Sequence, residues 1–289
     1  MEYFYTTLSK AKTEQKSINT QDDNYILASI AIVSARIDEL LQGNIPNRRP
    51  YFLPYKETRE IVLSTQNIQP RYNALLMPYF ILALTSVGIN GTDITSNARL
   101  YPPTYIPTKQ IQLNSTTNWL NYCTASDAYS TNYATIAGVW GYNSDYTNAW
   151  QSVDVITVAG INSSVTSFTV ADVDGVDVYG VTPRISAGNY ILIDSEVMLV
   201  TATNTTTNTV TVKRGVLGTT ASAHLVGASV STYEVEPTIG RVVNRQVGAM
   251  YARRGAYDAI TIETAGVVTY PPDLLPELEN VVTIYAGAY

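Results

Sequence analysis

The side chains that most often perform catalysis are scarce in this sequence of 289 residues, which contains one histidine, His224, and one cysteine, Cys123. Nucleophilic triads and zinc sites need several such groups to converge. His224 lies in a loop of small residues with no second histidine or cysteine nearby. We therefore expect His224 to anchor its loop by hydrogen bonds, and we expect a protein that is not an enzyme and uses no cofactor.

Three carboxylates around Gly175, those of Asp172, Asp174 and Asp177, resemble part of a calcium loop. Alternate carboxylates that flank a tight turn can direct their oxygens at one hard cation. The closing bidentate glutamate is missing at the expected offset, and Asp-Gly is also an ordinary turn dipeptide. A structural turn is the favoured interpretation, and a metal site at these aspartates is the alternative.

Asp194 and Glu196 form the other close acidic pair. They flank a predicted hairpin turn, where two solvated carboxylates are the common outcome. A glycosidase would need two carboxylates that face each other across a cleft, and spacing in the sequence does not supply that geometry.

Basic residues cluster on one predicted helix after Pro237. Arg241 and Arg245 are one turn apart, and Arg253 and Arg254 close the C-terminal end. These positions suit a solvated helix face and its dipole. The alternative is a subunit interface at which the four arginines pair with an acidic neighbour, because arginine suits bidentate ion pairs.

The composition favours an assembly protein over a DNA-binding one. There are 18 Lys plus Arg against 24 Asp plus Glu, and this net charge of −6 argues against an electrostatic grip on nucleic acid. The 22 tyrosines suit extended subunit contacts, although ordinary strand packing also explains many of them. We expect no internal disulfide, no signal peptide and no membrane span.

Helices are predicted at both ends of the chain. Apolar residues at helical spacing (Ile26, Ile30, Val33, Ile37 and Leu40) mark a helix over 21–42, capped by Thr20 and ended by Gly43. The other predicted helices cover 7–16, 238–254 with Thr238 as its cap, and 274–285 with Asp273 as its cap.

The middle of the chain has the pattern of β-structure. Prolines interrupt short β-branched and aromatic runs from residue 45 onward, and Asn90-Gly91 predicts a hairpin. Evenly spaced strands between 154 and 236 predict a small β-barrel or sandwich. The expected fold is α+β, with a helical bundle from the N- and C-terminal helices and a β-rich middle. We expect two domains: a core of 1–153 plus 237–289, and an inserted β-domain of 154–236.

Seven short sequence motifs occur in a fixed order along the chain, and this order carries a resemblance to a known family. They are 7–12 (TLSKAK), 75–78 (LLMP), 84–87 (LTSV), 100–104 (LYPPT), 136–142 (IAGVWGY), 187–196 (AGNYILIDSE) and 212–220 (VKRGVLGTT). With the helix that begins near Asp22-Asp23, this series resembles the head-tail connector proteins of tailed bacteriophages, also called adaptors or head-completion proteins. The inserted β-domain departs from the smallest members of that family, which are nearly all helix.

The resemblance implies a structural virion protein at the head-tail interface, assembled in the host cytoplasm. It implies a homo-oligomeric, dodecameric ring that docks under the portal protein, extends the DNA channel and carries the next neck or tail protein. DNA would pass through without specific binding, as an acidic surface allows.

The end of the chain is the expected portal-docking element. An exposed apolar segment is a liability unless a partner covers it. We therefore predict portal docking through Leu274, Leu278, Val281, Val282, Tyr285 and Tyr289.

Two other function classes remain open. A tail-associated receptor-binding or carbohydrate-binding β-protein would explain the Thr- and Asn-rich β-domain, but not the helices. A glycan-degrading enzyme would explain only the scattered carboxylates.

Overall fold

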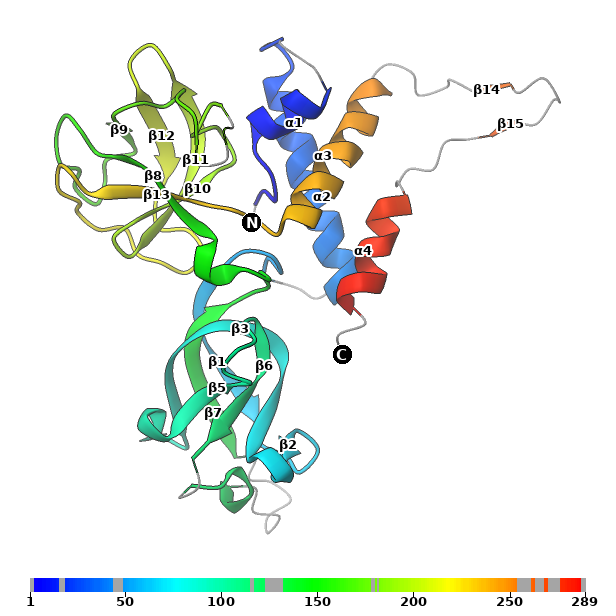
Figure 1. The fold of residues 1–289 in the computed structure, drawn as a ribbon, viewed down its shortest axis with the longest axis vertical. Helices are drawn as coiled ribbons and strands as arrows, with labels where there is room; N and C mark the ends of the chain where they lie inside the picture. The colour runs from blue at the N-terminus through cyan, green and yellow to red at the C-terminus, as the bar shows by residue number, and fades with distance from the viewer. Residues whose placement is uncertain are drawn as a thin grey trace. The chain divides into compact units, whose positions relative to one another are not determined.

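A computed structural model of the chain describes residues 3–15, 19–43, 49–114, 117–122, 132–177, 180, 182–253, 261–262, 268–269 and 276–286. The fold is α+β, as predicted, with helices at both ends of the chain and two antiparallel sheets in the middle (Figure 1). The chain divides into two compact units. The helix-barrel unit comprises Met1–Arg48, Gln151–Arg214 and Ala221–Tyr289, and the sheet unit comprises Arg49–Trp150 and Gly215–Thr220.

Four helices from opposite ends of the chain pack together in the helix-barrel unit: α1 (Leu8–Gln15), α2 (Asp23–Gln42), α3 (Pro237–Ala252) and α4 (Pro276–Ala286). Helix α3 packs against both N-terminal helices, and α4 packs against α2 and α3. The side chains that α2 buries recur at helical spacing, although Leu41 replaces the predicted Leu40 at the last turn. The predicted bundle from both termini is confirmed for these helices.

The helix caps differ from the predicted ones. Asp22, not Thr20, occupies the N-cap of α2, and it makes no side-chain capping bond. Helix α3 begins at Pro237 with Glu236 as its N-cap, so Thr238 lies inside the first turn. Proline suits this first helical position because its missing N–H would have no helical partner there. Gly43 ends α2 as predicted, with φ at +70°. Asp273 lies outside the described residues.

A six-stranded antiparallel sheet forms the second half of the helix-barrel unit. Its strands, in spatial order, are β8 (Trp150–Val155), β13 (Ser229–Tyr233), β10 (Tyr190–Ile193), β11 (Glu196–Asn204), β12 (Thr209–Lys213) and β9 (Ser167–Thr169). An antiparallel bridge between Ile156 and Val170 joins the extensions of the two edge strands. The sheet therefore closes into a small barrel around an apolar core, as the strand spacing predicts.

The sheet unit is built on the long strand β3 (Ala74–Ile89). Its main path runs β1 (Tyr55–Val62), β7 (Tyr133–Trp140), β3, β6 (Thr108–Leu113) and β5 (Ala98–Tyr101), and the short strands β2 (Ile68–Gln69) and β4 (Thr92–Asp93) also pair with β3. Asn90 and Gly91 have φ values of +49° and +83°, and Ile89 pairs with Thr92 across them. This two-residue turn with two positive φ angles confirms the predicted hairpin.

The predicted inserted domain of 154–236 stays a prediction. Strand pairing places most of that range in the barrel, and the contacts group the barrel with the terminal helices.

Candidate functional site

A non-helical segment at residues 3–7 connects the barrel with the helices inside the helix-barrel unit. The Phe4 N–H donates to the Tyr190 hydroxyl oxygen of β10 at 3.2 Å. On the helical side, the Tyr5 N–H donates to Ser34 Oγ of α2 at 3.0 Å, and the Tyr5 hydroxyl donates to Asp38 Oδ1 at 2.6 Å. These bonds hold the segment against both parts of the unit.

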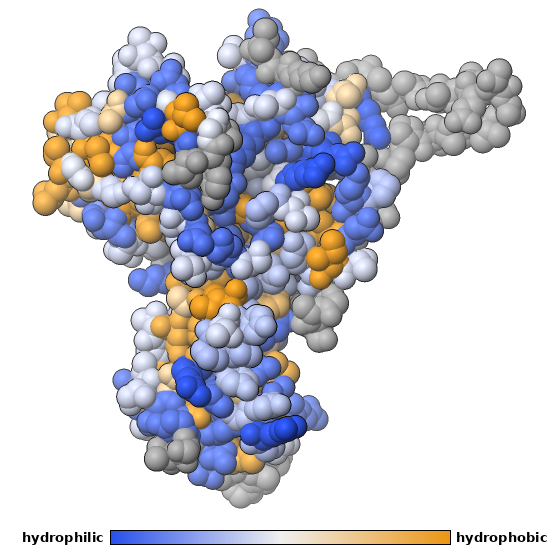
Figure 2. Space-filling view, in the orientation of Figure 1, coloured by the Kyte–Doolittle hydropathy of each residue, from blue (hydrophilic) through white to orange (hydrophobic). Residues whose placement is uncertain are grey.

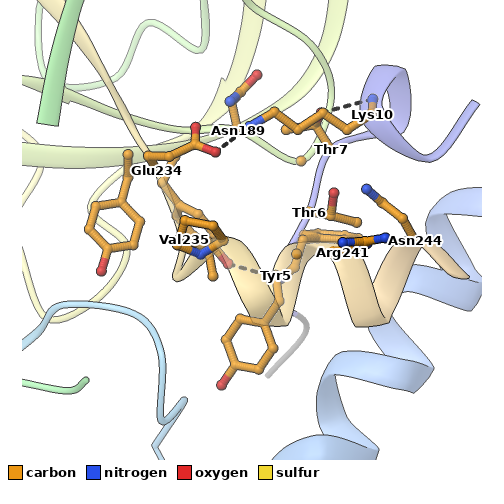
Figure 3. Close-up of a pocket in the computed structure, with 15 residues that line it drawn as sticks. Tyr5, Thr6, Thr7, Lys10, Asn189, Glu234, Val235, Arg241 and Asn244 are labelled. Atoms are coloured by element: carbon orange, nitrogen blue, oxygen red, sulfur yellow. Dashed lines mark hydrogen bonds and ion pairs between the residues drawn. The ribbon is translucent and has the colours of Figure 1, made fainter. Parts of the chain in front are cut away.

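A cavity of about 230 Å³ lies beside this segment, between the barrel and the first turns of α3 (Figure 3). Lys10 of α1 and Glu234, which follows β13, form an ion pair at 2.5 Å in its wall. The polar side chains of its lining, tyrosines apart, belong to Thr6, Thr7, Lys10, Asn189, Glu234, Arg241 and Asn244.

Two polar atoms of this lining are buried without a hydrogen-bond partner: Thr6 Oγ1 and Asn244 Oδ1. Thr6 is only 5% exposed. Arg241 lies on the exposed face of α3 and makes no hydrogen bond or ion pair with another described residue. Because unpaired buried polar groups are uncommon in folded proteins, this cavity is a candidate binding site in the described part of the chain.

The structure separates the four arginines that the sequence grouped. Arg241 borders the cavity, whereas Arg245 pairs with Glu277 of α4 at 2.6 Å. Arg253 occupies the C-cap of α3, and Arg254 lies outside the described residues. A subunit interface at these arginines stays a prediction, and the charge of Arg245 already has a partner within the chain.

His224 belongs to a buried cluster of charged side chains inside the barrel. Its Nδ1 lies 2.7 Å from Asp194 Oδ2 and its Nε2 lies 2.9 Å from Glu196 Oε2. Arg214 binds both oxygens of Glu196 at 2.7 Å, and the Ser222 N–H donates to Glu196 Oε2 at 2.9 Å. The predicted role of His224 as a hydrogen-bonded anchor of its loop agrees with these contacts.

The expectation of a solvated acidic pair at the hairpin is wrong for Glu196. The Asp194 side chain is 63% exposed, but the Glu196 side chain is fully buried. Glu196 begins β11, and Arg214, the residue directly after β12, provides the opposite charge that makes this burial possible. The sequence signal for the burial of Glu196 was Arg214, which follows β12. However, residue spacing alone does not show that β11 and β12 pair.

The cluster also contains the partners of a serine-hydrolase triad. Ser222 Oγ lies 3.4 Å from His224 Nε2, while Asp194 faces Nδ1. However, Glu196 lies closer to Nε2, where a nucleophile would deliver its proton, and the imidazole is fully buried. The geometry therefore suits a structural cluster better than a catalytic one.

The aspartate loop is organised by hydrogen bonds and one ion pair. Asp172 accepts the Gly175 N–H at 3.0 Å and faces Arg184 Nη2 at 3.2 Å. Asp174 is exposed, and in the described part of the chain no three metal-ligating side chains are grouped so that they could hold an ion. The arrangement agrees with the favoured structural turn. The metal site at Asp172, Asp174 and Asp177 stays a prediction.

Three of the six predicted portal-docking residues lie inside the helical bundle. Leu278, Val281 and Tyr285 of α4 are at most 7% exposed, whereas Ile284 on the same helix is 59% exposed. Leu274, Tyr289 and the side chain of Val282 lie outside the described part of the structure. Docking through this helix stays a prediction, and Ile284 is an exposed apolar side chain among the described residues of α4.

Exposed aliphatic side chains gather at one end of the barrel. Val158, Leu225 and Val226 are 76%, 81% and 54% exposed. The bridge between Ile161 and His224 places their two loops side by side. The space-filling view shows hydrophobic surface over the barrel (Figure 2). Such a patch is typical of a protein contact.

Apart from Arg241, the residues that form the cavity were not predicted from the sequence. Thr6, Lys10, Glu234 and Asn244 come from opposite ends of the chain, and only the packing of α1 and the segment before it against α3 brings them together. The one signal was Asn244, an uncharged polar residue between the two arginines of this helix.

The comparisons with protein-family models and with curated proteins find no match for this chain. In the described residues, no helix has the length and apolar character needed to cross a membrane.

Proposed function

We propose that this chain is a structural subunit of a bacteriophage neck, which forms a ring under the portal, extends the DNA channel and links head to tail. The observation that carries the proposal is the bundle formed by helices from both ends of the chain, α1 and α2 with α3 and α4. This is the arrangement that the resemblance to head-tail connectors implies. That resemblance itself rests on the ordered series of sequence motifs.

Surface chemistry supports the same proposal. A ring with head-to-tail contacts needs two different faces on each subunit. The exposed aliphatic loops around Val158 and Leu225 provide an apolar face, and Arg241 provides a cationic position on α3. A chain of net charge −6 also suits a channel through which DNA slides without binding.

Electron microscopy of the purified chain, alone and mixed with portal rings, tests this function. Rings, or a ring-shaped layer added beneath the portal, are the expected result. Trimers or binding to glycans would instead favour a tail-associated receptor-binding protein.

A matched pair of variants locates the portal contact. Ile284 on α4 and Ile32 on α2 are 59% and 60% exposed, so aspartate at either position should leave the fold intact. Ile284→Asp is expected to reduce portal attachment by about tenfold, the effect of about 1.4 kcal/mol, and Ile32→Asp to leave it unchanged. Equal attachment of both variants would argue against docking through α4.

A further inference from the structure

We propose that the cavity beside α3 is a recognition site for a carboxylate held next to a hydrogen-bond donor, the pattern that an aspartate or glutamate presents in an acidic peptide. Nothing in this inference depends on the neck function, because it rests only on the residues that line the cavity.

The charge of the lining favours an anion. Lys10 and Arg241 bring two positive charges, and Glu234 brings one negative charge. Glu234 is already engaged by Lys10 at 2.5 Å, whereas Arg241 has no ion-pair partner among the described residues. The guanidinium of Arg241 presents paired N–H groups that match the two oxygens of a carboxylate. The cavity is thus locally cationic in a chain whose net charge is −6.

The unpartnered atoms specify the group beside the carboxylate. Asn244 Oδ1 is an acceptor, so its missing partner is a donor such as a peptide N–H. The Thr6 hydroxyl can donate to a second carboxylate oxygen or accept from the same donor. Arg241 and Asn244 are three residues apart on α3 and so are neighbours on its surface, and Thr6 lines the same cavity (Figure 3). A ligand with both functions satisfies all three side chains at once.

The size of the cavity fits one such group. Its volume of about 230 Å³ is well above the about 30 Å³ that one water occupies in the liquid. It is below the about 300 Å³ at which sites for drug-sized ligands begin. An acidic side chain with its own peptide group, or a free amino-acid derivative, falls between these limits.

Titration with N-acetyl-aspartate tests the site, because this probe carries carboxylates and an amide N–H. Binding to the full chain is measured by calorimetry, with the neutral N-acetyl-asparagine amide as the control ligand. We expect N-acetyl-aspartate to bind and the control to bind at least about tenfold more weakly, since charge-assisted hydrogen bonds are the stronger ones.

Arg241→Gln and Arg245→Gln form a matched pair of variants on one helix. Arg241→Gln should weaken binding by about tenfold or more, and Arg245→Gln by less than about twofold, because Arg245 lies outside the cavity and pairs with Glu277. Thr6→Val, which keeps the side-chain shape, should weaken binding by about fivefold. Equal effects of the two arginine variants, or no binding of the probe, would overturn the proposal.

Sedimentation over a range of protein concentrations identifies the source of the carboxylate. If Arg241→Gln binds no probe but self-associates as the unmodified chain does, the site takes a free acid or an acidic segment of another protein. If it also loses self-association, the carboxylate belongs to a second copy of the chain. Both results support the site, and ring formation under the portal remains a separate measurement.

Discussion

Glu196→Gln is the most informative single substitution in the barrel. Glu196 is fully buried, accepts hydrogen bonds from Arg214 and the Ser222 N–H, and lies 2.9 Å from His224 Nε2. Glutamine would place an NH2 donor against these donors and leave the Arg214 guanidinium, only 6% exposed, without its counter-charge. Removal of one partner of a buried ion pair costs about 3–5 kcal/mol. That is a large part of the about 5–15 kcal/mol by which domains are stable.

The expected fall in melting temperature is about 6–20 °C, at about 2–4 °C per kcal/mol for domains of about 150–250 residues. Far-UV circular dichroism should follow the melting. Trp119 and Trp140 lie in the sheet unit, but Trp150 begins β8 of the barrel, so tryptophan emission reports on both units. Hydrogen exchange in β10 and β11 should accelerate in the variant.

Glu39→Gln is the matched control, since it removes the same charge from an exposed pair with Arg36. Exposed pairs contribute about 0–1 kcal/mol, so its melting temperature should hardly change. The combination of Glu196→Gln with Arg214→Met should recover part of the loss, because the unpaired buried cation is gone. Equal melting of the Glu196 and Glu39 variants would refute the assignment of a buried, charge-compensated cluster.

Three further predictions concern other parts of the fold. Gly188 has φ +94°, and Gly188→Ala would place a Cβ 2.9 Å from the Thr6 carbonyl oxygen. Gly227 has a similar φ of +85° but no atom within 4 Å, so Gly227→Ala should lower the free energy of unfolding by only about 1–2 kcal/mol. Urea unfolding should therefore show a larger loss of stability for Gly188→Ala. Tyr5→Phe removes the 2.6 Å bond to the buried Asp38 and should cost about 1.5–3 kcal/mol in the same assay; no change would show that the bond is not needed. Burial lowers the pKa of Lys109, so its charged form opposes folding at any pH below that value, although contact with an aromatic ring at 4.4 Å offsets part of this. Lys109→Met should therefore raise the melting temperature slightly at pH 7. The gain should shrink as the pH rises toward about 10.4, because the lysine is then neutral in the unfolded chain as well. A gain that persists at high pH would show that burial of the charge is not its cause.

Local patterns were sufficient to predict helices at both ends of the chain and the fold class. The apolar spacing in α2 and the Asn90-Gly91 turn are set by neighbours in the sequence, and both are present in the structure. The caps were less predictable. Thr20 and Asp22 are both good N-cap residues, and Glu236 precedes a proline that favours the first helical position, so propensity alone did not choose between adjacent candidates.

The candidate site was not predictable because it depends on distant parts of the chain. Thr6 and Asn244 are separated by nearly the whole sequence, and neither residue type indicates binding by itself. The burial of Glu196 likewise follows from the pairing of β11 with β12, which brings Arg214 beside it. Ion pairs and cavities across paired elements depend on register, which composition and spacing do not encode.

The His224 cluster and the polar lining of the cavity differ in how fully their buried polar atoms are hydrogen-bonded. In the His224 cluster the buried Glu196 has a hydrogen-bond donor on each oxygen, and the arginine that it binds also donates to the carbonyl oxygens of Asn162, Val165 and Ser222. In the cavity, Thr6 and Asn244 bury polar atoms with no donor or acceptor in reach. A satisfied network holds a fold in place, whereas an unsatisfied one beside an unpaired cation costs stability until a ligand or ordered water completes it. The His224 cluster therefore stabilises the barrel, and the cavity is the position at which this unit is suited to bind a ligand.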